Sequence, residues 1–200
     1  MSEPAPLAVV IAGPNGAGKS TLAPAIARDG FQLRDFVNAD EIARGLSGFD
    51  PASAALQAGR LMLRRLEELA SHRASFAFET TLATRSYAPW LRSLRTAGYQ
   101  VELLFVWLPS PELAIQRVAD RVRLGGHDIP VDVVRRRYEL GLRNLFRLYL
   151  PIADRWTVVD NSVGGSLRVI AAGAAATPHD VRDEALWSAL VASYGSENLP

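Results

Sequence analysis

Cysteine is absent from this 200-residue chain, and lysine occurs once, at Lys19. The absence of thiols excludes disulfides, cysteine nucleophiles and cysteine-ligated metals, and it suits a reducing compartment. The N-terminal segment has an acidic residue and prolines where a signal peptide needs positive charge, and its apolar run is too short to span a bilayer. We therefore expect a cytoplasmic protein that does not act in a membrane.

Charge of either sign is not in excess, because 22 Lys+Arg face 21 Asp+Glu and the net charge is +1. Such a balance gives no basic field of the kind that drives non-specific binding to nucleic acid. Of the 22 cations, 21 are arginine, so the single lysine stands out. A compact ammonium can reach between phosphates from a tight loop better than a forked guanidinium can. This predicts a phosphate contact for Lys19.

Apolar runs and helical periodicities alternate along the chain. Strands are expected at 7–12, 36–38, 75–79, 100–107 and 156–160, with an edge strand at 167–172. Helices are expected at 19–29, 51–72, 88–97, 111–123 and 131–149, with a short last helix opened by residues 177–180. This alternation predicts an α/β fold, a mainly parallel sheet of five or six strands flanked by helices. We expect one domain over 1–200, with its core at 7–162 and a C-terminal strand and helix from 163–200 packed on it.

Residues 13–21, GPNGAGKST, match the phosphate-loop pattern G-x-x-x-x-G-K-[ST] between a predicted strand and a predicted helix. In this pattern backbone N–H groups converge on phosphates, the lysine reaches the β- and γ-phosphates, and the Ser hydroxyl ligates Mg²⁺. The sequence therefore predicts a P-loop NTPase with ATP and Mg²⁺ as cofactors and Ser20 as the metal ligand. The predicted nucleotide-binding residues of the loop are Gly13, Pro14, Asn15, Gly16, Ala17, Gly18, Lys19, Ser20 and Thr21.

The absence of a transporter-type signature narrows the class of NTPase to which the chain can belong. Transporter-type ATPases share this loop, but they also need an LSGGQ-like signature far downstream and a hydrophobic strand that ends in Asp-Glu. The chain has only the segment GLSG at 45–48, directly after the second predicted strand, and no such strand end follows it. Because a composite ATP site between subunits cannot form without the signature, the sequence favours a kinase.

Polar residues follow the second and third predicted strands, at the edge where an acceptor would meet the γ-phosphate. Asp40 is the candidate base for the acceptor hydroxyl, and the alternative is a helix cap. Glu79 ends the third strand, where an acidic residue would lie near Mg²⁺ or substrate, and the alternative is a solvated strand end. Thr80, Thr81 and Arg85 follow on the same edge and are predicted to bind substrate.

Arginines gather between 117 and 147, with eight Arg against four acidic residues. Arg117, Arg121 and Arg123 share one predicted helix, and the segment GGHD containing His127 follows it. A helical lid of this kind can close over a triphosphate, and its arginines can stabilise transition-state charge. The alternative is a set of ordinary helix-surface pairs, such as Arg117 with Asp120.

The segments GPNGAGKST, VNADEIAR, FAFETTL, QRVADRVRLGGHDIP and VVDNS together resemble the zeta-toxin-like P-loop kinases, especially their short ATPase-like members, over residues 7–162. The resemblance implies that Lys19 and Ser20 hold ATP and Mg²⁺ and that Asp40 is the base. It further implies that Glu79 lines the substrate pocket and that Arg117 contacts phosphate. It places Asp160 and Asn161 near the adenine. The second lid arginine of the family does not align cleanly, with Arg121, Arg123 and His127 as candidates.

These features predict a kinase that phosphorylates a hydroxyl of a small molecule. Better-known members of the resembled family phosphorylate UDP-N-acetylglucosamine and are held inactive by a small helical antitoxin, so a nucleotide sugar and an antitoxin are the implied substrate and partner. A nucleoside, an antibiotic or a cofactor is an alternative acceptor. A nucleotide-binding switch that transfers no phosphate is the alternative from another functional class, and it would not need a carboxylate at Asp40.

Overall fold

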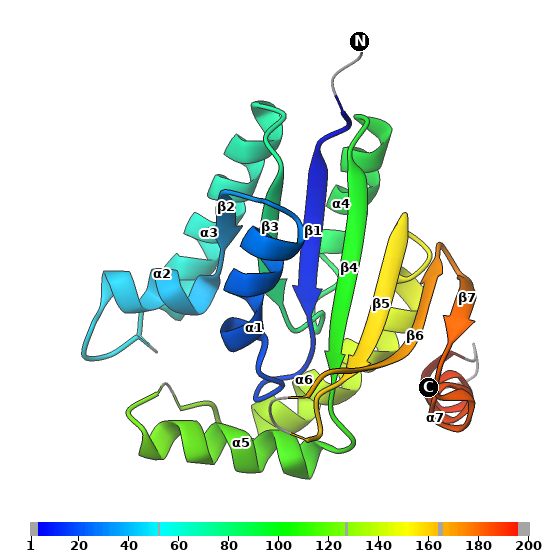
Figure 1. Ribbon diagram of the computed structural model, residues 1–200. Helices are drawn as coiled ribbons and strands as arrows, with labels where there is room; N and C mark the ends of the chain where they lie inside the picture. The colour runs from blue at the N-terminus through cyan, green and yellow to red at the C-terminus, as the bar shows by residue number, and fades with distance from the viewer. Residues whose placement is uncertain (1–3, 52, 127, 164–165, 196–200) are drawn as a thin grey trace.

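The computed structural model describes residues 4–51, 53–126, 128–163 and 166–195, and one seven-stranded sheet forms its centre (Figure 1). The strands are β1 (Leu7–Ala12), β2 (Asp35–Val37), β3 (Phe76–Thr80), β4 (Gln100–Trp107), β5 (Arg155–Asp160), β6 (Arg168–Ala174) and β7 (Thr177–Val181). Their order is β2-β3-β1-β4-β5-β6-β7, with β1 to β5 parallel and β6 and β7 antiparallel. The predicted mainly parallel α/β fold is confirmed, with seven strands in place of the expected five or six.

Strand β7 corrects the prediction for residues 177–180, which do not open a helix. They form the outermost strand, paired with β6. An edge strand tolerates Pro178, because an N–H that faces solvent is not needed for the ladder. The last helix, α7 (Glu184–Leu190), begins later, where the Asp183 side chain accepts a hydrogen bond from the backbone N–H of Leu186 at 3.0 Å.

Helices cover both faces of the sheet. They are α1 (Lys19–Ala25), α2 (Ala39–Leu46), α3 (Ala55–Ser71), α4 (Tyr87–Thr96), α5 (Pro111–Arg123) and α6 (Val131–Asn144), besides α7 and the π-helical segments η1 (Ile26–Gly30), η2 (Leu145–Tyr149) and η3 (Val191–Gly195). On one face, Ala23 of α1 belongs to the same cluster as Val9 and Ile11. On the other face, Met62 of α3 and Leu91 of α4 join the main core. Alternate residues of β1 therefore enter opposite cores, as expected of a strand covered on both faces.

The parallel register brings the carboxyl ends of β1 to β5 to one edge of the sheet. Ile11 of β1 lies beside Glu79 of β3, and Trp107 of β4 lies beside Asp160 of β5. Helix α5 crosses below this edge in the view of Figure 1. Because β1 lies between β3 and β4, the chain connections that leave the strands on its two sides run in opposite directions. Ligands of open α/β sheets bind in the crevice that forms at such a point.

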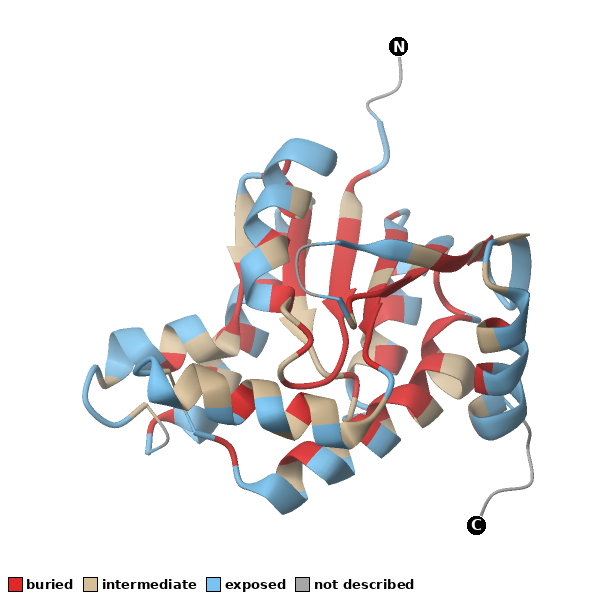
Figure 2. Cartoon of the chain, turned by 60° about the horizontal axis from the view of Figure 1, so that its bottom comes forward, coloured by how far each residue is buried: buried red, intermediate tan, exposed pale blue. Residues whose placement is uncertain are grey.

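Burial follows this layering. The central strands are buried, while the surrounding helices expose their outer sides (Figure 2). Gly13, Pro14 and Asn15, which follow β1, are buried as well, although they form a loop. No helix in the described part of the chain is long and apolar enough to cross a membrane.

Candidate active site

The loop between β1 and α1, residues 13–21, depends on glycine for its shape. Gly13 and Gly16 have φ values of 142° and 77°. A Cβ added to them would lie 2.2 Å from the carbonyl oxygen of Val106 and 2.6 Å from that of Ala114. Only glycine permits both this backbone conformation and so close an approach. The loop is therefore held tightly against β4 and α5, and the glycines of the motif are required by its packing.

The end of β5 braces the loop from another side. Asn161 donates a hydrogen bond from Nδ2 to the carbonyl oxygen of Ala17 at 2.8 Å. Asp160 is buried, pairs with the guanidinium of Arg168 and accepts a hydrogen bond from the backbone N–H of Ser162 at 2.7 Å. Although burial disfavours its charge, these hydrogen bonds lower the pKa of Asp160. The contacts position the loop and the strand end, and adenine binding by either residue stays a prediction.

Lys19 is buried at the start of α1, with a side chain that is 5% exposed. Its Nζ donates a hydrogen bond to the carbonyl oxygen of Pro14 at 2.9 Å and lies 3.6 Å from Oε1 of Glu79. Burial lowers the pKa of Lys19, and the charges of Glu79 and Asp40 partly offset this effect. The only ammonium side chain of the protein is thus held inside the loop and faces two carboxylates.

Glu79 connects the loop to the end of β2. Its Oε2 accepts hydrogen bonds from Oγ of Ser20 at 2.9 Å and from Nδ2 of Asn38 at 2.7 Å. The register explains this contact, because Val37 pairs with Phe78 and the next residues of the two parallel strands are neighbours. Glu79 is therefore no solvated strand end.

Asp40 lies in the first turn of α2, and the cap of this helix is Asn38. The Oδ1 atom of Asn38 accepts hydrogen bonds from the backbone N–H groups of Asp40 at 2.7 Å and Glu41 at 3.3 Å. The cap interpretation of Asp40 is therefore wrong, because the amide two residues earlier performs that task. The carboxylate of Asp40 is half-buried and lines the cavities described next.

A cavity of about 230 Å³ opens above the loop, and we call it the loop cavity. The loop residues that line it are Asn15, Gly16, Gly18, Lys19, Ser20 and Thr21. Asp40, Glu79, Arg117 and Arg121 complete its walls. Arg117 is anchored by a hydrogen bond from Nη2 to the carbonyl oxygen of Ser162 at 2.8 Å.

Arg123 lies apart from the other two arginines of α5. Its side chain is 76% exposed, its Nη1 lies 3.2 Å from Oδ1 of Asp120, and it lines neither the loop cavity nor the neighbouring ones. The structure therefore brings Arg117 and Arg121 together at the loop and leaves Arg123 on the surface. His127, the other lid candidate, falls outside the described residues.

A second cavity, of about 290 Å³, adjoins the first, and we call it the threonine cavity. Asn15, Lys19, Asp40 and Glu79 line both. The walls that the second cavity does not share with the loop cavity include Thr80 at the end of β3, Thr81 and Thr84 after it, Met62 of α3, Tyr87 of α4 and Arg137 of α6. Arg85, which the sequence groups with the two threonines before it, is exposed and does not line this cavity.

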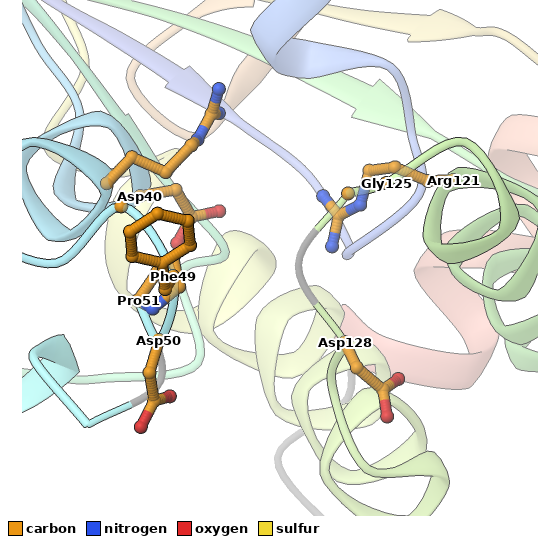
Figure 3. A pocket seen from close by; sticks show the side chains of 10 residues that line it. Asp40, Phe49, Asp50, Pro51, Arg121, Gly125 and Asp128 are labelled. Carbon is orange, nitrogen blue, oxygen red and sulfur yellow. The ribbon is translucent and has the colours of Figure 1, made fainter.

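A third hollow, the outer cleft of about 520 Å³, continues from Asp40 toward the surface (Figure 3). One wall carries Asp40, Phe49 and Pro51 from α2 and the segment after it. The opposite wall carries Arg121 and Asp128, from the end of α5 and the segment that follows. Asp40 therefore lies where three hollows meet.

The donor atoms near the loop suit Mg²⁺. The hydroxyl of Ser20 and the carboxylate of Glu79 lie side by side, and Mg²⁺ takes oxygen ligands, commonly one or two from the protein with the rest from phosphates and water. In the described part of the chain, no group of three or more His, Cys, Asp and Glu side chains could hold a metal. The oxygen atoms of Ser20 and Glu79 fit a Mg²⁺ whose other ligands come from nucleotide phosphates and water.

Sequence reasoning missed two residues that organise this site. Asn38 both caps α2 and holds Glu79, and an Asn directly before a helix is a signal that could have shown the cap. Arg137 lines the threonine cavity. The apolar periodicity of 131–149 predicts the helix, but it does not indicate which part of the protein the polar side of that helix faces.

The model of the zeta toxin family matches residues 1–164. A protein of Haemophilus influenzae described as uncharacterized is 30% identical over 131 residues, which cover 66% of this chain and 91% of that protein. The crystal structure of AvrRxo1-ORF1:-ORF2 with ATP aligns with a TM-score of 0.75 and 19% identity over 98% of this chain. The present chain spans 65% of the length of that solved chain.

A structure of the PezAT chromosomal toxin-antitoxin system of Streptococcus pneumoniae aligns with a TM-score of 0.63 and 18% identity, over 98% of this chain and 81% of that chain. At these identities the solved structures show a shared fold. The family model, in contrast, covers most of the chain and confirms the resemblance carried by the sequence motifs. The chain therefore belongs to the zeta toxin family.

Proposed function

We propose that this protein is an ATP-dependent kinase that transfers the γ-phosphate to a hydroxyl of a small molecule. One observation carries the proposal: Asp40 lines both the loop cavity and the threonine cavity. A carboxylate at this junction can take the proton of a hydroxyl in one cavity as that hydroxyl attacks a phosphate in the other. A switch that only senses nucleotide would not need a carboxylate there.

Residues of the loop form the nucleotide side of the proposed site. The backbone N–H groups of the loop and the ammonium of Lys19 would bind the phosphates. Ser20 and Glu79 would hold Mg²⁺, which when bound neutralises charge on the phosphates. Arg117 and Arg121 would face the transferred group, and Arg117 is already oriented by its hydrogen bond to Ser162.

The acceptor would enter through the outer cleft and place its hydroxyl beside Asp40. Thr80 and Thr81 would bind its polar groups in the threonine cavity. A UDP-N-acetylglucosamine-like nucleotide sugar is one acceptor that the family resemblance suggests, and the outer cleft offers room for a nucleotide part. A nucleoside, an antibiotic or a cofactor fits the same chemistry.

A controlling protein partner is a further part of the proposal. AvrRxo1-ORF1 was solved in complex with AvrRxo1-ORF2, and PezAT is a toxin-antitoxin system. By analogy, we propose that an antitoxin-like protein binds this chain and blocks its site.

The proposed activity is tested by incubating the protein with γ-labelled ATP, Mg²⁺ and a metabolite extract. We expect label to enter a small molecule that chromatography separates from ATP and inorganic phosphate. A protein that binds ATP but labels no small molecule would contradict the kinase proposal and favour the nucleotide-binding switch.

Lys19 offers a direct test of the nucleotide site, because the N-terminus is the only other amine. We expect Mg-ATP to protect Lys19 from an amine-reactive reagent, since bound phosphates would cover its Nζ. Peptide mass spectrometry measures the modified fraction at both amines, and the N-terminus serves as the internal control. Equal labelling of Lys19 with and without saturating Mg-ATP would remove it from the phosphate site.

A further inference from the structure

Arg137 lies on α6 and lines the threonine cavity, as Asn15 and Lys19 of the loop do. It is half-buried, and the cavity walls also include Asp40, Glu79 and the threonines at and after the end of β3. It is the one cation in the wall of that cavity besides Lys19, as far as the described residues show. Lys19 is engaged by the loop, whereas Arg137 faces the cavity from a helix that takes no part in the loop.

The surroundings of Arg137 do not satisfy its guanidinium. Among the described residues it has no hydrogen-bond or ion-pair partner. Arg137 also lines a small cavity of about 130 Å³, whose other walls are Asp40 and the largely apolar set Ala39, Ala43, Pro51 and Ala55. Burial and the charge of Arg136 lower the pKa of Arg137, and the charge of Asp40 partly offsets them. The guanidinium nevertheless remains charged, as arginine does in proteins.

A partly desolvated guanidinium without a partner is costly, because it has lost water and gained no hydrogen bond in exchange. Its planar fork of donors matches a carboxylate or a phosphate. The cost is removed when such a group enters the threonine cavity. The charge of the Asp40 carboxylate raises the pKa of Arg137, but the same carboxylate also acts on Lys19.

The remaining walls of the cavity suit hydroxyl groups. The Oγ1 atoms of Thr80 and Thr81 accept hydrogen bonds from the backbone N–H groups of Leu82 at 3.1 Å and Ala83 at 3.4 Å. Each hydroxyl therefore keeps its proton available for donation to a ligand. A volume of about 290 Å³ is at the small end of ligand sites.

We propose that Arg137 binds a carboxylate or phosphate group of the phosphoryl acceptor, so that the acceptor is a small polyhydroxylated anion. This inference rests on the proposed kinase function and names the substrate class of the same site. The anionic group would orient the acceptor so that a neighbouring hydroxyl lies beside Asp40. Arg137 is then a specificity-determining residue, and the base and the nucleotide site do not depend on it.

The test compares three ligands with one carbon skeleton: sorbitol, gluconate and sorbitol 6-phosphate. The protein is first saturated with Mg-ADP, so that added phosphate groups cannot bind at the loop. Calorimetry then measures the affinity of each ligand for the parent, Arg137→Ala, Arg137→Lys and Arg136→Ala. Arg136 is the matched control, because it is the exposed neighbour on the same helix and lies outside the threonine cavity.

We expect the parent to bind gluconate or sorbitol 6-phosphate at least about tenfold more tightly than sorbitol, and the choice between the two identifies carboxylate or phosphate. Arg137→Ala should lose this preference by about tenfold to a hundredfold, Arg137→Lys should keep part of it, and Arg136→Ala should keep all of it. No preference in the parent, or an undiminished preference in Arg137→Ala, would overturn the inference. The parent comparison needs no variant, so misfolding of a variant cannot hide a negative result.

The labelled extract separates failure of this inference from failure of the proposed function. The extract is divided by anion exchange into anionic and neutral fractions before the reaction. Labelled product from the anionic fraction supports both proposals. Labelled product from the neutral fraction alone would keep the kinase and overturn the role of Arg137. If no compound is labelled, the kinase proposal fails, while the calorimetry still decides whether Arg137 binds anions.

Discussion

Replacing Arg121 with alanine is expected to lower kcat by about a thousandfold while changing the affinity for ATP far less. Arg121 lies on α5, where it lines both the loop cavity and the outer cleft. In phosphoryl transfer the negative charge on the equatorial oxygens is stabilised by positive groups, so a guanidinium contact that strengthens in the transition state raises the rate more than it raises binding. Single-turnover rates and nucleotide affinities measured on one variant separate the two effects.

Arg123→Ala is the matched comparison for Arg121, since it removes the same group two residues further along α5. Its side chain is largely exposed and pairs with Asp120, so we expect the parent's rate. Arg117→Ala should lose at least about a hundredfold in kcat, because Arg117 lines the loop cavity. Equal losses in Arg121→Ala and Arg123→Ala would contradict this assignment and indicate a role for the helix as a whole.

The separation of these arginines could have been predicted from helix geometry. Residues 117 and 121 are four apart and differ by about 40° around a helix axis, whereas 121 and 123 differ by about 200°. A count of arginines along the segment places the three in one group, because such a count carries no information about the helical period. The structure adds which side of α5 faces the strand ends and therefore the site.

The phosphate loop and the edge of the sheet where the parallel strands end were predictable, because short stretches of sequence indicate each of them. The phosphate-loop motif carries its own glycines, and the apolar run before it predicts β1. Asp40 and Glu79 were found for a related reason, since carboxyl ends of parallel strands meet at one edge. Their contacts were less predictable, because the hydrogen bond between Ser20 and Glu79 joins residues 59 positions apart.

Long-range packing explains what the sequence did not reveal. The position of Arg137 depends on how α6 lies against the segment after β3: a Cβ on Gly141 would be 2.5 Å from the carbonyl oxygen of Thr81. No pattern within 131–149 indicates that approach. The edge strand β7 was not predicted, because the pair Thr177 and Pro178 is also typical of the first residues of a helix. Only pairing with β6 distinguishes the two structures.

Asp40→Asn is expected to lose phosphoryl transfer by a factor of about a hundred to ten thousand. The substitution keeps the size of the side chain and removes the proton acceptor beside the acceptor hydroxyl. Because Asn38 caps α2, stability should change little, and we expect a melting temperature within a few degrees of the parent. Mg-ATP affinity should stay near that of the parent, because the proposed metal and phosphate ligands are intact.

Glu41→Gln is the matched control for Asp40→Asn. Glu41 is the next residue of the same helical turn, is exposed and pairs with Arg44 at 2.7 Å. Its replacement removes an equal charge from α2 outside the cavities, so the transfer rate should not fall. If both variants lose the same activity, the net charge of the helix would be responsible, and Asp40 would not be the base.

A third result is distinguishable from these two. Lost ATP binding together with lost transfer in Asp40→Asn would indicate a Mg²⁺ role for Asp40 and move the base assignment to Glu79. Lys19 supplies an independent readout, because the charge of Asp40 raises the pKa of Lys19 and its removal should lower that pKa further. An amine reagent should then modify Lys19 faster at a given pH in the nucleotide-free variant. Faster labelling with intact Mg-ATP protection and lost transfer would leave the proton-accepting role as the explanation for Asp40.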